Sequence, residues 1–299
     1  MKTSNDQTSF MVDKSKISYH RCSEVEDHFI HQAFQDGFSD YMIKMEISEQ
    51  DFIQRFFGPE GNSRDTSFIA FYEQQPVGVI LGGIKKYETI KTMRCGTLAI
   101  HPDFRGKGIS QKLFGLHKEE AIKQGCKQLF LEVIVGNDRA IHFYKKLGYE
   151  KIYDIVYYSN QDLSGLKIIL ETKSAAIIRS LDFNDFQTHI QKWTYHINWQ
   201  NDIDFLEKLT DNYYFGAYQN EELVGCLSIN SNGGISFLMV DKNVRGQGIA
   251  TLLLQTACKN LDLSKMSTGF PNNSLLEGFY KMHGFQKGNL AQYEMYLIL

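Results

Sequence analysis

The sequence lacks several features that would assign it to a large functional class. No apolar run approaches the ~20 residues of a membrane-spanning helix, and the first residues lack the apolar core of a signal peptide. The 32 Lys and Arg residues do not outnumber the 35 Asp and Glu residues, so the chain lacks the basic excess that binding to nucleic-acid phosphates needs. We therefore predict that it binds neither membranes nor nucleic acids.

The cysteines and histidines show no pattern of a disulfide framework or a metal site. The five cysteines contain no CxxC pair and their number is odd, which fits thiols in a reducing cytoplasm. His101, His117 and His142 have no spacing typical of metal ligands. Cys126 is best interpreted as a small buried hydrophobe. We expect a cytoplasmic protein that binds no metal.

Length and composition indicate a globular chain of two domains. With 299 residues, the chain has about twice the usual domain length of ~100–150 residues. Hydrophobic residues make up 42% and charged residues 22%, which is ordinary for a soluble protein and sufficient for two cores.

The chain contains an internal repeat. The turn FRGKGIS at residues 104–110 recurs as VRGQGIA at residues 244–250, so that Arg105 corresponds to Arg245, 140 positions later. Downstream, FYKKLGY at residues 143–149 recurs as FYKMHGF at residues 279–285, with a shift of 136 positions. A repeat of this length predicts two copies of one α/β unit.

Each copy alternates strands with helices. Two apolar segments joined by a polar turn, FIAFYEQQPVGVILGGI in the first copy, predict a β-hairpin. A third strand enters the glycine turn, a helix follows, and QLFLEVIV predicts a further strand. This order favours an α/β (α+β) fold. We place the first module at residues 1–171 and the second, smaller and partly degenerate, at residues 172–299.

The two glycine turns have the ingredients of an anion site. The first N–H groups of a helix lack intrahelical partners, the helix dipole adds positive potential, and glycine lets the backbone approach phosphate. Gln111 and Thr251 stand where the dinucleotide motif GxGxxG needs a third glycine, and GxxxxGK[ST] is absent. The alternative is a surface turn in which glycine only permits the bend.

The first copy resembles the GNAT (GCN5-related) family of acetyl-CoA-dependent N-acetyltransferases in the order of its elements. These are the strand LAI, the turn RGKGIS, a helix, the strand LEVIVGN and the helix ending in FYKKLGY. The pyrophosphate turn of that family has the form [RQ]xxGx[GA]; the second turn matches it throughout, and the first departs from it only at Ser110. The resemblance covers nearly the whole chain. It implies two tandem modules, each a mixed, mostly antiparallel sheet flanked by helices, with acetyl-CoA between the splayed third and fourth main strands.

The resemblance also implies which residues bind the cosubstrate acetyl-CoA. They are the end of the third strand, the glycine turn, the start of the helix and one asparagine. In the first module these are Leu98, Ala99, Ile100, Arg105, Gly106, Lys107, Gly108, Ile109, Ser110, Gln111 and Asn137. A possible second site would use Leu238, Val240, Arg245, Gly246, Gly248, Ala250, Asn273 and Tyr280.

The implied reaction is direct attack of a primary amine on the thioester. A backbone N–H at the end of the strand LAI would stabilise the oxyanion. Tyr144, seven residues after Asn137, matches the family's general acid; a phenol of pKa ~10 can protonate a leaving thiolate of pKa ~8.5. Glu132 stands where relatives carry a candidate base. Alternatively, Tyr144 is a core residue, Glu132 is solvated or structural, and Asn137 also caps the following helix.

The second copy departs from the pattern at its last strand. Thr268 replaces Glu132, and KMSTGFPNN at residues 265–273 has few β-branched or apolar residues. Pro271 also removes a ladder donor. We therefore expect a poorly formed strand there and catalysis in the N-terminal module, although the second copy retains the better turn and Tyr280.

The acceptor is not identified by the sequence beyond a small-molecule or peptide amine, and the oligomeric state stays open. Asp36 and Asp40 would share one helical face, where a cationic amine or only water would meet them. Two other functions stay open, a non-catalytic sensor of CoA or acetyl-CoA and catalysis in the C-terminal module. The intact turns and the charge balance disfavour a third, an aminoacyl-tRNA-dependent ligase.

Overall fold

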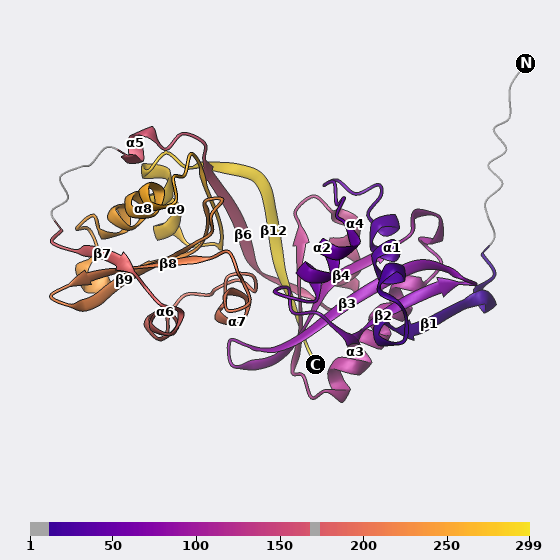
Figure 1. Ribbon diagram of the computed structural model, residues 1–299. Coiled ribbons are helices and arrows are strands. Elements are labelled where there is room, and N and C mark those ends of the chain that lie inside the picture. Colours follow the sequence, from indigo (N-terminus) through magenta and orange to yellow (C-terminus); the bar gives the residue numbers. More distant parts are fainter. Residues whose placement is uncertain (1–11, 168–173) are drawn as a thin grey trace, which may run out of the picture. The chain divides into compact units, whose positions relative to one another are not determined.

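A computed structural model describes residues 12–167 and 174–299 (Figure 1). Its contacts divide the chain into two compact units, which we call unit 1 (residues 1–132 and 296–299) and unit 2 (residues 133–295). The predicted border between the two modules, at residues 171 and 172, lies outside the described residues.

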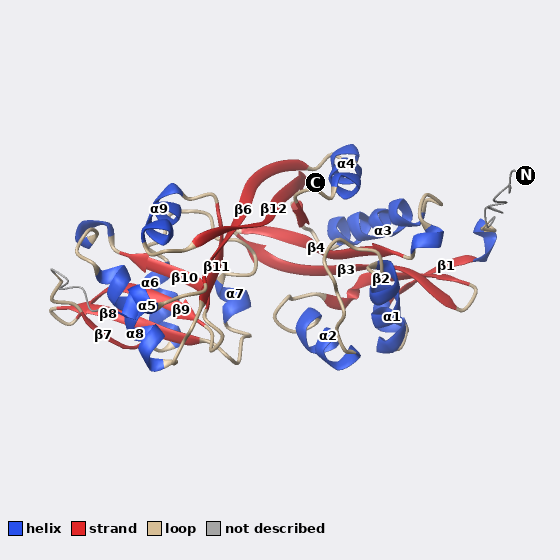
Figure 2. Ribbon diagram, turned by 90° about the horizontal axis from the view of Figure 1, so that it is seen from above, coloured by secondary structure: helices blue, strands red, loops and turns tan. Residues whose placement is uncertain are grey.

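Unit 1 is a mostly antiparallel sheet covered by helices on both faces. Its strands follow the order β1-β2-β3-β4-β5, and only the β4–β5 neighbours are parallel. Figure 2 shows α3 on one face and α1 and α2 on the other. The elements are β1 Ile17–Arg21, α1 Asp27–Gly37, α2 Glu49–Phe56, β2 Ser63–Tyr72, β3 Gln75–Tyr87, β4 Ile90–Ile100, α3 Ile109–Lys123 and β5 Gln128–Ile134, whose last two residues belong to unit 2.

The core of unit 1 explains why α1 forms a helix. Ile30, Ala33, Phe34 and Gly37 are buried at helical spacing, and they pack with apolar residues of α2, β2 and β3. The helix ends at Gly37, so the prediction that Asp40 shares a helical face with Asp36 is wrong.

Unit 2 has the same architecture. Its strands follow the order β12-β6-β11-β10-β9-β8-β7, and β10 and β11 are the parallel pair. Leu238 and Val240 pack with α8, whereas Phe237 and Met239 pack with α6 on the opposite face. The elements are α4 Asp138–Lys146, β6 Glu150–Asn160, α5 Ser164–Lys167, β7 Ile177–Ser180, α6 Phe183–Ile190, α7 Ile203–Leu206, β8 Tyr213–Gln219, β9 Glu222–Ile229, β10 Gly234–Val240, α8 Ile249–Asn260, β11 Met266–Pro271, α9 Ser274–Met282 and β12 Gln286–Ile298.

The prediction of a weak strand at residues 265–273 is wrong. β11 pairs with β6 along all six of its residues, from Met266 opposite Asn160 to Pro271 opposite Ile155. The proline stands at the end of the strand, where a missing donor costs little. The pairing with β6 stabilises a segment whose own composition does not favour a strand.

Candidate functional site

The two glycine turns have the same backbone. Gly106 and Gly108 have φ of 74° and 92°, and Gly246 and Gly248 have φ of 77° and 83°. These left-handed conformations favour glycine. Gly108 and Gly248 are the N-cap residues of α3 and α8, and neither helix has a side-chain cap. The first N–H groups of both helices are therefore left for another acceptor.

Open space adjoins both turns. A Cβ built on Gly106 or Gly246 would meet no atom within 4 Å. Backbone N–H groups next to such space, at the positive end of a helix dipole, form a site for an anion of phosphate size. The predicted residues Lys107, Ser110 and Gln111 lie in or directly after the first turn, and Ala250 directly after the second. Both turns therefore have the backbone geometry of such an anion site.

An arginine holds each turn to the strand before it. Arg105 Nε donates to the carbonyl of Ile100 at 3.0 Å, and Arg245 Nε donates to the carbonyl of Val240 at 2.9 Å. The arginine of the sequence motif thus shapes the turn. The paired carbonyls are the last of β4 and β10.

The two arginines differ in whether a carboxylate neutralises their charge. Arg105 also donates to the carbonyl of Gly37 and to both carboxylate oxygens of Asp40, at 2.5 and 2.6 Å, so an aspartate neutralises it. Arg245 has no other hydrogen-bond or ion-pair partner among the described residues and is exposed. The second turn therefore offers a cation to an anionic ligand, while the first offers Lys107.

The strand that enters each turn is bulged and only partly paired. β4 carries one extra residue at Gly96 opposite β3, and β10 carries one at Ser236 opposite β9; bulges bend the strand. On the other side, β4 pairs with β5 only from Thr92 to Arg94, although β4 continues to Ile100. The predicted residues Leu98, Ala99 and Ile100 follow the end of that pairing.

The same opening exists in unit 2. β10 pairs with β11 only at Gly234 and Ile235, and β10 continues to Val240. The early end of the parallel pairing is therefore present in both copies.

Glu132 lies in a buried charge cluster. Arg94 Nε donates to Glu132 at 2.7 Å, and Arg94 Nη1 donates to Glu60 at 2.7 Å. All three side chains are at most 6% exposed. Burial alone would lower the pKa of Arg94, but the charges of Glu132 and Glu60 raise it above its usual value. The sequence did not reveal this partner, which lies 38 positions away.

Asn137 and Asn273 cap the helices that follow them. Asn137 accepts a hydrogen bond from the N–H of Ala140, and Asn273 accepts from the N–H groups of Leu275 and Leu276. The predicted capping role is confirmed at Asn137, and Asn273 has the same role in the second copy.

The predicted acid Tyr144 and its counterpart in the second copy, Tyr280, are both buried. Tyr144 packs against Phe143 and Tyr149. Tyr280 is 1% exposed and lies against Phe270. Burial raises the pKa of Tyr280, and a hydrogen bond with Thr268 opposes part of that shift. The Tyr280 phenol is therefore protonated at neutral pH.

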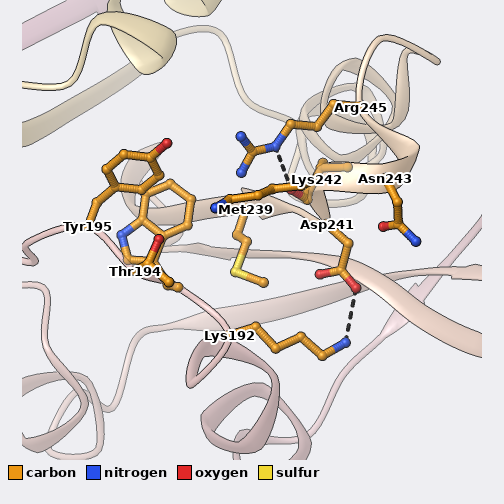
Figure 3. Close-up of a pocket in the computed structure, with 10 residues that line it drawn as sticks. Lys192, Thr194, Tyr195, Met239, Asp241, Lys242, Asn243 and Arg245 are labelled. Atoms are coloured by element: carbon orange, nitrogen blue, oxygen red, sulfur yellow. Dashed lines mark hydrogen bonds and ion pairs between the residues drawn. The ribbon is translucent and has the colours of Figure 1, made fainter.

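Two pockets lie along β10 in unit 2. One, which we call the turn pocket, has a volume of about 270 Å³ and is lined by residues 192–195 and 239–243 together with Arg245. Figure 3 shows Arg245 hydrogen-bonded to the last carbonyl of β10 and Lys192 paired with Asp241. Tyr195 lies at the opposite side of the pocket. Lys242 adds a further cation to its lining.

The second pocket lies where β10 and β11 separate, and we call it the β10–β11 pocket. It has a volume of about 30 Å³, room for about two water-sized groups. It brings together the predicted residues Leu238, Asn273 and Tyr280 with Thr268. His196 also lines it; no pattern in the sequence singles out this residue, because it lies in a loop without periodic apolar positions.

The described residues show two further absences. No helix among them is long and apolar enough to cross a membrane. Within the same ranges, no three His, Cys, Asp or Glu side chains gather as a metal site requires. All five cysteines are buried thiols.

Comparisons with known proteins agree with this geometry. A family model described as the acetyltransferase (GNAT) family matches residues 26–149, and a model described as an acetyltransferase (GNAT) domain matches residues 183–297. Together the two models cover most of the chain.

Two curated relatives are acetyltransferases by name. Acetyltransferase ECA0875 of Pectobacterium atrosepticum is 33% identical over 88 residues, which are 29% of this chain and 60% of that protein. N-alpha-acetyltransferase 30 of Dictyostelium discoideum is 25% identical over 140 residues, which are 46% of this chain and 75% of that protein. The chain thus spans less than two thirds of the first of these relatives.

Solved structures share the fold over nearly the whole chain. A tandem GNAT protein from the clavulanic acid biosynthesis pathway has a TM-score of 0.68 at 13% identity and covers 94% of this chain and 98% of its own. A GCN5-related N-acetyltransferase from Sphaerobacter thermophilus has a TM-score of 0.66 at 12% identity, with 95% and 96% covered. With a GNAT match and an arginine-held glycine turn in each half, the chain belongs to the GNAT acetyltransferase family as a tandem of two GNAT modules.

Proposed function

We propose that the protein transfers an acetyl group from acetyl-CoA to a primary amine of a small molecule or peptide. The observation that carries this proposal is the uncapped, glycine-lined helix start beside a strand whose pairing ends early, present at both α3 and α8. Such a site binds a diphosphate at the helix start and an extended arm along the strand. The names of the relatives, one of them an N-alpha-acetyltransferase, favour an amine acceptor.

The proposal assigns the chemistry to the N-terminal module, at residues 1–171. The N–H groups of residues 109–111 would bind the pyrophosphate, and the backbone of residues 98–100 would bind the pantetheine arm. Acetyl-CoA supplies the thioester whose carbonyl carbon the amine attacks. Tyr144 is proposed as the acid that protonates the leaving thiolate. A phenol is protonated at neutral pH and can donate its proton to the thiolate as the C–S bond breaks.

The base role of Glu132 stays a prediction. Its carboxylate accepts a hydrogen bond from Arg94, and this fixes its position. The same cation lowers its affinity for a proton. A carboxylate in this setting would act through a water that relays the amine proton, and a pH–rate profile tests this role.

The experiment is a thiol-release assay with acetyl-CoA across polyamines, aminoglycosides, arylalkylamines and peptides with a free amino terminus. We expect release with at least one acceptor. For that acceptor, Gly108→Glu should abolish turnover, because it places a charged side chain at a positive-φ position where phosphate would bind. Gly115→Glu, on the same helix with open space at its Cβ, is the matched control and should retain activity.

The possible outcomes distinguish the alternatives. CoA binding without acetyl product across the whole panel would replace the enzyme with a sensor. Loss of every activity on Gly248→Glu, with none lost on Gly108→Glu, would move catalysis entirely to the C-terminal module. Circular dichroism establishes that each variant is folded.

A further inference from the structure

The turn pocket contains an arginine whose two Nη groups have no partner among the described residues. Arg245 Nε donates to the carbonyl of Val240 at 2.9 Å, and no described residue forms another hydrogen bond or ion pair with the guanidinium. Figure 3 shows the guanidinium turned toward Tyr195. The Nη groups of a planar guanidinium form a fork that matches the two oxygens of a carboxylate or phosphate. All residues that line the pocket belong to unit 2.

The first copy shows which chemical group such a fork binds. Arg105 makes the same hydrogen bond to the end of its strand, at Ile100. Its two Nη groups donate to the two carboxylate oxygens of Asp40, at 2.5 and 2.6 Å. Asp40 lies in the loop after α1. In unit 1 the chain itself therefore supplies a carboxylate that the arginine binds through both oxygens.

The corresponding loop of unit 2 supplies no carboxylate. The helix α6 packs on the sheet of unit 2 as α1 packs on the sheet of unit 1. Residues 191–201, which follow α6, include neither Asp nor Glu. Residues 192–195 of this loop line the turn pocket together with Arg245. The partner that Asp40 provides in unit 1 is therefore left for a ligand in unit 2.

The strand that enters each turn explains why the pocket exists only beside the second arginine. A Cβ on Gly37 would lie 2.6 Å from the Cβ of Ala99, so the end of α1 lies directly against β4. The counterpart of Ala99, 140 positions later, is Met239. Met239 packs with residues of α6 and lines the turn pocket. Because methionine is larger than alanine, the loop after α6 cannot approach β10 as closely.

The charges of the pocket favour an anion. Its lining contains the three cations Arg245, Lys192 and Lys242 and one carboxylate, that of Asp241. Asp241 pairs with Lys192 at 3.0 Å and lies 3.3 Å from Nε2 of the buried His189. No described residue forms an ion pair with Lys242. Two cations, Arg245 and Lys242, therefore remain for a ligand.

The rest of the lining is largely apolar. Trp193 and Tyr195 lie with their ring centroids 4.9 Å apart, and Met239 lines the same pocket. The volume of about 270 Å³ is several times the ~30 Å³ that a water molecule takes up in the liquid. The pocket thus has room for an organic group beside the anion, and its aromatic wall favours an apolar one.

We propose that the turn pocket binds a small molecule that carries a carboxylate on an aromatic or apolar chain. Arg245 donates both Nη groups to the carboxylate, as Arg105 does to Asp40, and Lys242 adds a second cation. The chain of the ligand packs against Trp193 and Tyr195. This binding requires no acetyl-CoA, so it goes beyond the proposed acetyl transfer.

The test is a titration of the full-length chain with 3-phenylpropionate at pH 7 and low ionic strength, followed by NMR without CoA. We expect a dissociation constant of about 10 mM or less. The neutral analogue 3-phenylpropanamide should bind at least about tenfold more weakly, because it lacks the charge. The chain has two tryptophans, so Trp193→Phe identifies the indole N–H signal of Trp193, which should shift on binding.

Two pairs of variants test the fork. Arg245→Met should weaken binding about 10- to 150-fold. Its matched control is Arg179→Met, at an arginine of β7 that pairs with Glu221, and it should leave the affinity unchanged. Thr194→Asp should abolish binding, because it supplies the pocket with a carboxylate of the chain's own, whereas Thr194→Asn should not. Thr194 is exposed, so this second pair keeps the test decisive if Arg245→Met does not fold.

A phosphate of CoA would bring the same charge to Arg245 without using the aromatic wall. Acetate and inorganic phosphate are therefore titrated in parallel, and 3-phenylpropionate should bind at least about tenfold more tightly than acetate. Equal affinities for the two carboxylates, or tighter binding of phosphate than of 3-phenylpropionate, would assign the fork to a phosphate and overturn the inference.

Three other results would also overturn it. They are the absence of binding at about 10 mM, an indole signal of Trp193 that does not move, and a folded Arg245→Met or Thr194→Asp chain of unchanged affinity. None of these results bears on acetyl transfer, because the titration contains no acetyl-CoA. The thiol-release assay tests that function separately, so either proposal can fail while the other stands.

Discussion

The effect of replacing Arg94 in unit 1 can be worked out from its contacts. Its guanidinium bonds to Glu132 and Glu60, and all three side chains are almost completely buried. Arg94→Met preserves the apolar stem of the side chain but leaves Glu132 without the cation it pairs with and leaves Glu60 with only the exposed Arg55, at 3.5 Å. Breaking a buried ion pair by removing one partner costs about 3–5 kcal/mol.

That loss is large compared with a usual unfolding free energy of about 5–15 kcal/mol. One kcal/mol shifts Tm by about 2–4 °C in a protein unit of about 150 residues. We therefore expect the Tm of unit 1 to fall by about 6–20 °C in Arg94→Met. Thermal unfolding followed by circular dichroism measures this fall. Arg55→Met is the matched control, since Arg55 is 58% exposed and also pairs with Glu60, at 3.5 Å; it should cost at most about 1 kcal/mol.

The loss should also depend on pH. Without Arg94, burial raises the folded-state pKa values of Glu132 and Glu60 above those of the unfolded chain. A carboxyl with a raised folded pKa contributes stability below its unfolded pKa and loses it as pH rises through the folded pKa. The difference in Tm from wild type should therefore be greatest near pH 7 and shrink toward about pH 4.5. An Arg94→Met chain that resembles Arg55→Met, or a difference independent of pH, would refute this reasoning.

Four further predictions concern the site. Tyr144→Phe should lower kcat at least tenfold and leave acetyl-CoA affinity nearly unchanged; unchanged turnover in thiol release, with chemistry rate-limiting, would remove Tyr144 as the acid. Glu132→Gln should shift activity to higher pH, where more of the amine is already deprotonated and needs no base. A pH–rate profile identical to wild type would exclude Glu132 from the mechanism. Arg245→Met should weaken CoA binding to the C-terminal module about 10- to 150-fold, the value of a charged hydrogen bond of about 1.5–3 kcal/mol. Asp40→Asn should strengthen binding to the N-terminal module up to about fivefold, because it releases Arg105 from an exposed ion pair. Calorimetric titration of CoA checks both affinities, and equal affinities before and after would contradict the charge difference between the turns.

Features set by local interactions could be predicted from the sequence. The glycines of both turns adopt positive φ, because no other residue does so at so little cost. Asn137 caps α4, since the capping bond joins residues three positions apart. The apolar periodicity that indicates the helix α1 and the hairpin β2–β3 is also a local pattern, because it involves residues close together in the sequence.

Features set by distant partners could not be predicted. Asp40 pairs with an arginine 65 positions away, and His196 pairs with a glutamate 98 positions away. β11 is a strand because β6 pairs with it, although its composition alone argues against it. No local pattern encodes a contact whose partner is supplied by the fold.

The same distant contacts decide how two copies of one motif differ. In both copies an arginine donates to the last carbonyl of the entering strand, so the shape of the turn is shared. Its charge is not shared, because Asp40 neutralises Arg105 while no described residue neutralises Arg245. The buried charged pairs differ as well, since Glu132 lies against Arg94 and His196 lies against Glu294. The repeat therefore keeps the shape of the glycine turn in both copies and changes the charged groups around it.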